Sequence, residues 1–325
     1  MVVRPLTLNL WFTLLVAALL FSGCKGELGE KNNPIRIFVV PSQGADRSEA
    51  AAKKLAAHLE AATDLKFTVS VPQNYIDLVV AVGNEEADLL FMNDMSYLLA
   101  NDKYGASAAF AVERADGDDS YRGMIFTRTD TGINSLEDLE GKTIGIVDVY
   151  SASGYILPAM LLREKGVSPG KLERAGEHDL VVKEVYSKGV DAGFSYTHDD
   201  DTMGQDDARA RMKDVMPDVF EVTKVLAVTT AVPSEPVVFG AHVPSAVREK
   251  VSEALADYAS SEEGRTVLME LNEITGLHPV TDKDYDPVRK ALLGLGEEID
   301  TKVEGGGLLE LRQKVRAAPI PPLGD

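Results

Sequence analysis

The chain has 325 residues, of which 52 are acidic and 33 are basic, and its formal net charge is −19. This balance excludes the basic surfaces that nucleic acids and anionic membranes attract, so we expect neither as a partner. Cys24 is the only cysteine, which excludes a disulfide within the chain. A hydrophobic core must therefore hold the fold, and roughly 300 mature residues are enough for two lobes.

The N-terminal segment has the pattern of a lipoprotein signal. Arg4 precedes an apolar run from Leu10 to Phe21 that is too short to span a membrane, and Ser22-Gly23-Cys24 follows. Such signals usually carry Leu where this chain has Phe21. We predict a signal peptide over 1–23, lipidation at Cys24, and an extracytoplasmic protein held at the membrane only by this anchor. An ordinary signal peptide with an incidental cysteine is the alternative.

Strand-like and helix-like runs alternate in the first part of the mature chain. Residues 24–33 are polar and are expected to form a flexible tether. Beyond them we predict strands over 35–40, 67–71, 88–91 and 121–127. We also predict helices over 47–62, with Ser48 as its cap, over 75–82, and from 96 to 100.

A second series of strands and helices begins after Gly132. Ser135-Leu-Glu-Asp138 resembles a short capping box, and Gly141 is expected to end its helix. Beyond Pro244 the chain is expected to be wholly helical. Alternating strands and helices indicate βαβ units and parallel sheets. The predicted strands are 143–147, 190–195, 220–228 and 236–240, and the predicted helices are 154–165, 179–188, 245–258 and 262–273.

The two series predict two α/β lobes. Lobe one takes residues 34–127 together with 240–325, and lobe two takes residues 128–239. The chain would then cross between the lobes twice, near Thr127 and near Phe239, and these crossings would form a hinge.

The segment from Thr143 to Tyr155 has the pattern of an anion site. A buried strand leads into a loop with hydroxyl side chains, and a helix follows at once. The first turn of a helix has N–H groups without intrahelical partners and a partial positive charge, which attract anions. Ser151 and Ser153 would add hydroxyl donors, and Gly154 would let the backbone approach closely. The alternative is that one serine merely caps the helix, and this motif alone leaves both interpretations open.

The chain resembles the phosphate/phosphite/phosphonate-binding proteins of ABC importers from about Phe38 to about Glu253. Nine motifs occur in the order of that family, and the one that contains Ser151, Ser153 and Gly154 is the most specific. They are Pro72-Gln-Asn-Tyr75, Glu86-Ala-Asp88-Leu-Leu-Phe, Ser96-Tyr97 with Ala100, Tyr121-Arg122, Ser135-Leu-Glu-Asp-Leu-Glu-Gly-Lys142, Asp148 to Pro158, Gly176-Glu-His178, Val190-Asp191-Ala192, and Val232-Pro-Ser-Glu-Pro236. The resemblance implies a two-lobed periplasmic-binding-protein fold of type II, with the ligand cleft between the lobes.

The resemblance also implies a set of ligand-binding residues. Tyrosine and serine hydroxyls donate to oxyanion oxygens without adding charge, and His178 can donate as a neutral ring or as imidazolium. Glu235 can only accept while it is ionised, so it would need a protonated group on the ligand. Each residue has a structural alternative: packing for the tyrosines, capping for His178, and a turn for Glu235. The implied residues are Tyr75, Tyr121, Ser151, Ser153, Gly154, His178 and Glu235, with Asn93 and Asp94 nearby.

The chain departs from that family at two positions. Ala152 stands where relatives often carry another hydroxyl, and His198 stands where aminophosphonate binders carry a glutamate for the amine. Asp199 could take that role after a one-residue shift. The acidic stretch 199–207 lacks the ligand spacing and the central glycine of a calcium loop, so we expect a solvated loop there and no metal site.

These features predict a solute-binding lipoprotein of an ABC importer. It would bind a small phosphorus oxyanion (phosphonate, phosphite or phosphate) as a monomer, without a cofactor, and would deliver the anion to permease and ATPase subunits. One rival is a sensor that reports the anion to a membrane receptor. Another is a transferase on a related two-lobed fold, but the chain shows no nucleophile, metal-ligand spacing or cofactor motif for an enzyme.

Overall fold

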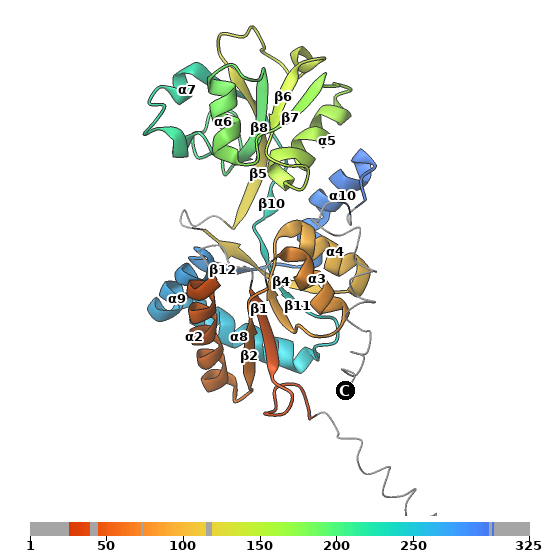
Figure 1. The fold of residues 1–325 in the computed structure, drawn as a ribbon, viewed down its shortest axis with the longest axis vertical. Coiled ribbons are helices and arrows are strands. Elements are labelled where there is room, and N and C mark those ends of the chain that lie inside the picture. Colours follow the sequence, from red (N-terminus) through yellow and green to blue (C-terminus); the bar gives the residue numbers. More distant parts are fainter. Residues whose placement is uncertain (1–25, 40–44, 73, 115–118, 299–300, 302–325) are drawn as a thin grey trace, which may run out of the picture.

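A computed structural model describes residues 26–39, 45–72, 74–114, 119–298 and 301. The predicted signal peptide, Cys24 and residues 302–325 lie outside this range. Two lobes stand end to end, and each is built on one six-stranded sheet with helices on its faces, which confirms the predicted two-lobed α/β fold (Figure 1). None of the helices in the described ranges is long and apolar enough to cross a membrane.

Lobe one is built on a mixed sheet in the order β12-β4-β11-β3-β1-β2. β1 runs parallel to β2 and β3, whereas β11 is antiparallel to both β3 and β4, and β12 is antiparallel to β4. The strands are β1 (Ile35–Val39), β2 (Phe67–Ser70), β3 (Leu89–Phe91), β4 (Ser107–Glu113), β11 (Pro236–Phe239) and β12 (Gly276–Pro279). The helices are α2 (Ala45–Thr63), α3 (Tyr75–Gly83), α4 (Asp94–Tyr104), α8 (Ser245–Ser260) and α9 (Glu262–Asn272).

Both faces of this sheet are buried. Successive side chains of a strand point to opposite faces, so each central strand contributes to two hydrophobic clusters. Leu89 and Phe91 of β3 join the cluster under α2, α8 and α9, whereas Leu90 joins the cluster under α3 and α4. β11 divides in the same way, with Val237 on one face and Val238 on the other. The central strands of the lobe-one sheet are therefore continuous apolar runs.

Lobe two is built on strands in the order β10-β5-β8-β6-β7, and β9 also pairs with β5. β6 runs parallel to β7 and β8, whereas β5 is antiparallel to β8, β9 and β10. The strands are β5 (Ser120–Arg128), β6 (Thr143–Ile146), β7 (Lys171–Arg174), β8 (Ala192–Thr197), β9 (Thr223–Val228) and β10 (Val232–Pro233). The helices and turns are η1 (Glu137–Leu139), η2 (Ala152–Ile156), α5 (Leu157–Glu164), α6 (His178–Tyr186), η3 (Ala210–Met212) and α7 (Val219–Val222).

The predicted parallel pairing is confirmed for β1 with β2 and β3 and for β6 with β7 and β8, but both sheets are mixed, since β5 and β11 run antiparallel to their neighbours. The predicted crossings differ as well: β5 pairs along its length with strands of lobe two, and β11 pairs with β3 and β4 of lobe one. The chain leaves the first sheet after Glu113, joins the second at Ser120, and returns between Pro233 and Pro236. Neighbouring strands are parallel when a crossover helix connects them within one lobe. β5 and β11 each enter their sheet from the other lobe, without such a helix, so they can pair antiparallel.

Several local predictions also differ from the structure. α2 begins at Ala45, so Ser48 lies inside the helix, where its hydroxyl donates to the carbonyl of Leu271 (3.2 Å). The helix expected after Ser135 is the single 3₁₀ turn η1. β4 and β12 were not predicted, and β12 interrupts a region that we expected to be wholly helical. The alanines of β4 weaken its alternation, and β12 is only four residues long.

The predicted tether, residues 24–33, is wrong from Gly26 onward. The amide of Lys66 donates to the carbonyl of Gly29 (2.7 Å), and the side chain of Leu28 packs against the core of lobe one. The segment was expected to be flexible because it is mostly polar, but Leu28 holds it against the lobe.

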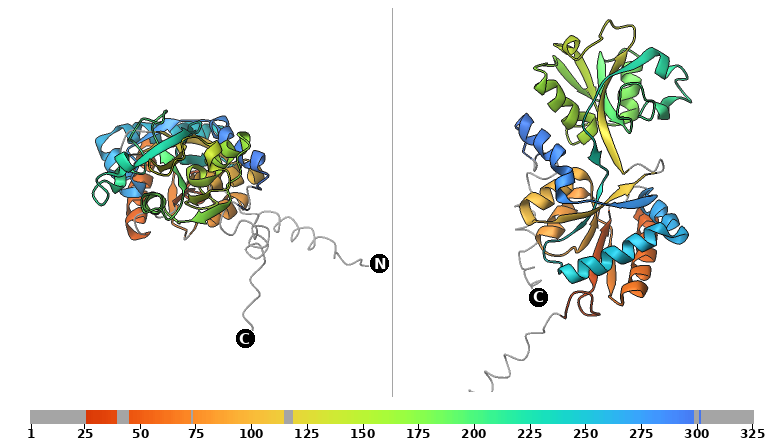
Figure 2. Two further views of the ribbon diagram at one scale, coloured as in Figure 1. Left: turned by 90° about the horizontal axis from the view of Figure 1, so that it is seen from above. Right: turned by 180° about the vertical axis from the view of Figure 1, so that it is seen from behind.

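Helix α10 (Asp286–Leu295) joins the lobes by a third connection. It follows η4 (Asp282–Tyr285) of lobe one, yet it packs against η2 and α5 of lobe two (Figure 2). Val288 and Leu292 of α10 lie in the same hydrophobic cluster as Ile156 of η2. A Cβ atom on Gly294 would lie 2.5 Å from the sulfur of Met160, so the two helices approach closely there.

Candidate functional site

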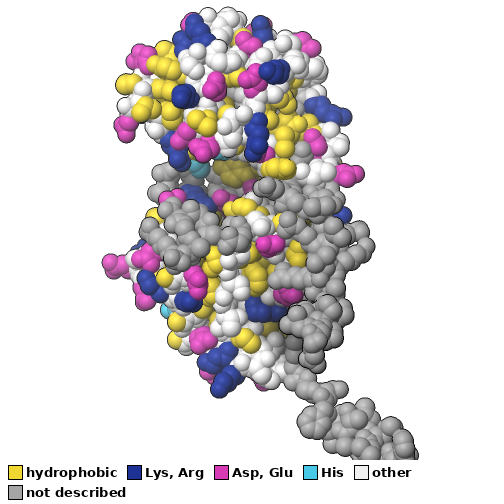
Figure 3. Space-filling view, in the orientation of Figure 1, with side chains coloured by type: hydrophobic (Ala, Val, Ile, Leu, Met, Phe, Trp, Pro, Cys, Tyr) yellow, Lys and Arg dark blue, Asp and Glu magenta, His cyan; other side chains and the backbone are white. Residues whose placement is uncertain are grey.

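A cavity of about 780 Å³ lies between the two lobes. The space-filling view shows the molecule hollowed at this level, with histidine and basic side chains visible inside (Figure 3). Asp94, which we placed beside the site, also lines the cavity, but Gly154 does not. The other predicted ligand-binding residues all line it: Tyr75, Asn93, Tyr121, Ser151, Ser153, His178 and Glu235.

The serine turn lies at the start of η2, directly after β6. The Ser151 hydroxyl oxygen accepts from the amide of Gly154 (3.0 Å). The amide of Ile156 donates to the Ser151 carbonyl (3.1 Å), and this bond closes one π-helical turn. Ser151 is therefore a helix cap. A hydroxyl that accepts one bond can still donate its proton, so capping does not prevent Ser151 from binding an anion. Ser153, which is 6% exposed, also lines the cavity.

Gly154 serves packing. A Cβ atom at this position would lie 2.5 Å from a methyl carbon of Val147, at the end of the preceding strand. The expectation that Gly154 lets the backbone approach a ligand is thus not supported by its position. The glycine instead allows η2 to fold back onto β6.

We expect Gly154→Ala to lower the free energy of unfolding by about 1–3 kcal/mol, the usual effect of overpacking a filled interior. Denaturant unfolding of the ligand-free protein measures this directly. Unchanged stability together with weakened anion binding would contradict the packing role and return Gly154 to the ligand site.

His178 is half-buried, and its ring is neutral at pH 7. Its Nδ1 lies 2.8 Å from the hydroxyl of Ser195 on β8, and its ring meets Tyr196 edge to face at 4.9 Å. Burial, and to a lesser extent Arg211, lowers the pKa of His178 to about 4. Of the two donor forms considered from the sequence, the neutral ring is therefore present at pH 7. If the fully buried Ser195 donates to Nδ1, the proton of His178 lies on Nε2, where it can donate to an anion.

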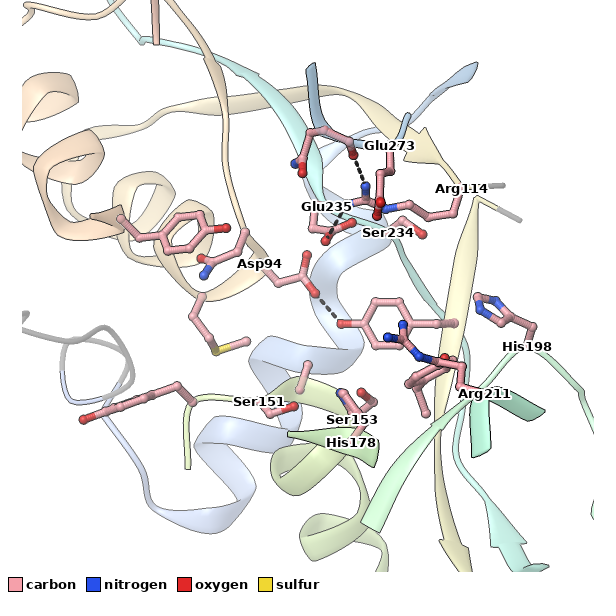
Figure 4. A pocket seen from close by; sticks show the side chains of 18 of the residues that line it. Asp94, Arg114, Ser151, Ser153, His178, His198, Arg211, Ser234, Glu235 and Glu273 are labelled. Atoms are coloured by element: carbon pink, nitrogen blue, oxygen red, sulfur yellow. Dashed lines mark hydrogen bonds and ion pairs between the residues drawn. The ribbon is translucent and has the colours of Figure 1, made fainter. Parts of the chain in front are cut away.

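The opposite wall of the cavity carries two acids, one paired with an arginine and one buried beside a tyrosine (Figure 4). Glu235 pairs with Arg114 at 2.8 Å, and Arg114 also donates to the carbonyl of Asn272. Asp94 is buried, and one of its oxygens accepts from the hydroxyl of Tyr121 in the other lobe. Burial, and then the charge of Glu235, raises the pKa of Asp94 to about 7. Burial and the nearby Asp94 carboxylate raise the pKa of Tyr121 well above its usual range, so this hydroxyl remains a donor.

Two arginines that we did not predict as site residues also line the cavity. Arg114 follows the last residue of β4, and Arg211 lies on η3, where it pairs with Asp179 of α6 (3.2 Å). They add positive charge that the helix N-terminus alone does not provide. Neither belongs to a motif, and each is brought to the cavity by the arrangement of the lobes.

The acidic stretch 199–207 is only partly the solvated loop that we expected. Asp207 is buried in an ion pair with Arg209 (2.6 Å), and Arg209 also stacks on the ring of Phe220. Asp199 accepts from the amide of Asp206 (2.7 Å) and does not line the cavity, so it does not replace the missing glutamate. His198 does line the cavity, with Nδ1 at 3.1 Å from the carbonyl of Ser120. Metal-ligand clusters were not found in the described ranges.

A polar cavity between two α/β lobes joined by two chain crossings defines a periplasmic-type solute-binding protein. The family profile described as "ABC transporter, phosphonate, periplasmic substrate-binding protein" matches residues 37–285. The chain belongs to this family of transporter substrate-binding components.

Known proteins agree with this assignment. The chain is 26% identical over 312 residues to the "Phosphate-import protein PhnD" of Mycolicibacterium smegmatis, covering 86% of this chain and 94% of the relative. It is 22% identical over 269 residues to the "Phosphonates-binding periplasmic protein" of Escherichia coli, covering 81% and 76%. The structure of PhnD1 from Prochlorococcus marinus with methylphosphonate has the same fold, with a TM-score of 0.56, 16% identity, and coverage of 81% and 98%.

Proposed function

We propose that the protein captures a tetrahedral phosphorus oxyanion in the interlobe cavity and delivers it to the permease and ATPase subunits of an ABC importer. The observation that carries this proposal is the grouping of Ser151, Ser153 and His178 on one wall of the cavity. The names of the relatives, which specify phosphate and phosphonates, support the same ligand class.

The chemistry of this wall suits an oxyanion. The two serine hydroxyls and the first-turn amides of η2 donate without carrying net charge, and the neutral ring of His178 donates through Nε2 when Ser195 donates to its Nδ1. Tyr75 and Tyr121 face the same cavity from the two lobes, so they would contact the anion when the lobes close. Arg114 and Arg211 then offset the charge of the anion, although the whole chain is acidic.

A thermal-unfolding screen with phosphate, phosphite, methylphosphonate, 2-aminoethylphosphonate and sulfate tests this function. A ligand at 100 times its Kd stabilises the folded state by about 2.7 kcal/mol, so binding raises Tm measurably. We expect at least one phosphorus anion to raise Tm. A screen in which none of them does so would contradict the proposed function.

We further propose that Cys24 is acylated and holds the protein on the outer face of a membrane. The sequence Ser22-Gly23-Cys24 after the apolar run supports this. Cys24→Ser should move the protein from the membrane fraction to the soluble fraction of a bacterial host, whereas Ser22→Ala, which keeps a small residue before the cut, should stay anchored. Mass spectrometry that finds an unacylated Cys24, or cleavage at another position, would contradict the prediction.

A further inference from the structure

Asp94 is the most unusual group in the cavity wall. It is the first residue of α4, behind the cap Asn93, and only 7% of it is exposed. One carboxyl oxygen, Oδ2, accepts from Tyr121, and the other, Oδ1, is buried without a hydrogen-bond partner in the described part of the chain. A buried carboxylate oxygen without a donor is costly, and this one has almost no accessible surface, so a donor from outside the chain would reach it only when the lobes and the side chains around it move on binding.

The other acids of the cavity are not in this situation. Glu235 has 41% of its side chain exposed and is paired with Arg114. Glu273 lies at the exposed end of α9. Glu235 was the residue that we expected to face a protonated ligand group, but its partner in the structure is an arginine. Asp94 alone among these three acids combines burial with an unpaired oxygen.

We propose that Asp94 Oδ1 accepts a hydrogen bond from the protonated oxygen of the bound phosphorus oxyanion, and that this contact excludes anions without a proton. The inference rests on the proposed function, because it assigns a selectivity residue within the same cavity. The serine turn and His178 donate to the unprotonated oxygens from lobe two, while Asp94 accepts from lobe one. The anion would thus be bound by donors on one side and an acceptor on the other.

This arrangement separates phosphate from sulfate, which have the same tetrahedral shape. Phosphate carries at least one P–O–H group at neutral pH, whereas sulfate carries no proton. Where Asp94 is ionised, above about pH 7, a sulfate oxygen would meet the lone pairs of Asp94 Oδ1, and burying two acceptors against each other without a donor is strongly unfavourable.

Titration calorimetry at pH 8, where Asp94 is ionised, tests the inference on the wild type, Asp94→Asn and Asp102→Asn with phosphate, methylphosphonate, 2-aminoethylphosphonate and sulfate. Asp102 lies on the same helix and is exposed, so its variant is matched in charge. We expect the wild type to bind phosphate at least 100-fold more tightly than sulfate. An asparagine amide can accept from Tyr121 and donate to an unprotonated oxygen, so Asp94→Asn should reduce that ratio to below about 10-fold. Asp102→Asn should keep the wild-type ratio.

The possible failures are distinct. A wild type that binds none of the phosphorus anions overturns the proposed function and this inference together. A wild type that prefers phosphate, with the same preference in folded Asp94→Asn, overturns the inference alone. If the wild type prefers 2-aminoethylphosphonate and Asp94→Asn loses only that preference, Asp94 accepts from an ammonium group and the P–O–H contact is wrong. Circular dichroism of each variant establishes that it is folded.

Discussion

Replacing both Ser151 and Ser153 by alanine is expected to weaken binding of the phosphorus oxyanion by at least 100-fold. A hydrogen bond to a charged group contributes about 1.5–3 kcal/mol, and the double variant removes two such donors, coupling aside. Because every 1.4 kcal/mol is tenfold in Kd, the loss should exceed two orders of magnitude in calorimetry.

Part of this effect could come from the fold, because Ser151 caps η2. Loss of a serine cap costs about 0.5–2 kcal/mol of stability. Ser261 caps α9 through the same kind of bond, to the amide of Gly264 (2.9 Å), and does not line the cavity. Ser261→Ala should therefore lose similar stability and keep normal affinity. Near-normal affinity in the Ser151/Ser153 double variant would reduce the motif to a helix cap.

Asp94→Asn is expected to stabilise the ligand-free protein by up to about 4 kcal/mol at pH 8. The pKa of Asp94 rises from 3.8 to about 7 on folding, and each unit corresponds to 1.36 kcal/mol. Between these values the folded state binds more protons than the unfolded state, so this group lowers stability as the pH rises from about 4 to about 7. Below about pH 4 both states are protonated, and the two proteins should be equally stable in this respect.

Denaturant unfolding of the wild type and Asp94→Asn from pH 4 to pH 8 measures this difference. The half-buried His178 acts in the opposite direction: because its pKa is lowered, stability rises between about pH 4 and its ordinary pKa near 6.5, in both proteins alike. Subtracting one curve from the other therefore isolates Asp94. Asp102→Asn should show little of this effect, since Asp102 is exposed. A stabilisation that does not vary with pH would show that the Asp94 carboxylate is not the cause.

The sequence located one wall of the cavity because its signal is local. A buried strand, two serines, a glycine and a helix follow one another within 13 residues, and this order places Ser151 and Ser153 at a strand end whatever the rest of the chain does. Arg114 and Arg211 have no such signal. They meet at the cavity only because the two lobes face each other, and a linear pattern contains no information about that approach.

The partners of β5 and the burial of Asp94 were also missed, because both depend on contacts with residues distant in the sequence. The apolar alternation of β5 predicts a strand but not its partners, so the lobe to which it belongs could not be assigned from its own residues. Asp94 follows a short buried strand and begins a helix, where acids are common and usually exposed. In the structure it is buried, and its carboxyl accepts from Tyr121, which is 27 positions away and in the other lobe.

The packing of α10 on α5 and η2 has a mechanical consequence. Two chain crossings alone would let the lobes both bend and twist, whereas the packing of α10 on the other lobe, beside the serine turn, should restrict the twist. We therefore expect the lobes to open by a swing about an axis on the α10 side, in which the rim across the cavity travels furthest. If the cavity binds the proposed anion, its residence time should depend on how far that rim swings, and a bulkier residue at Gly294, which would push α10 away from Met160, should shorten it.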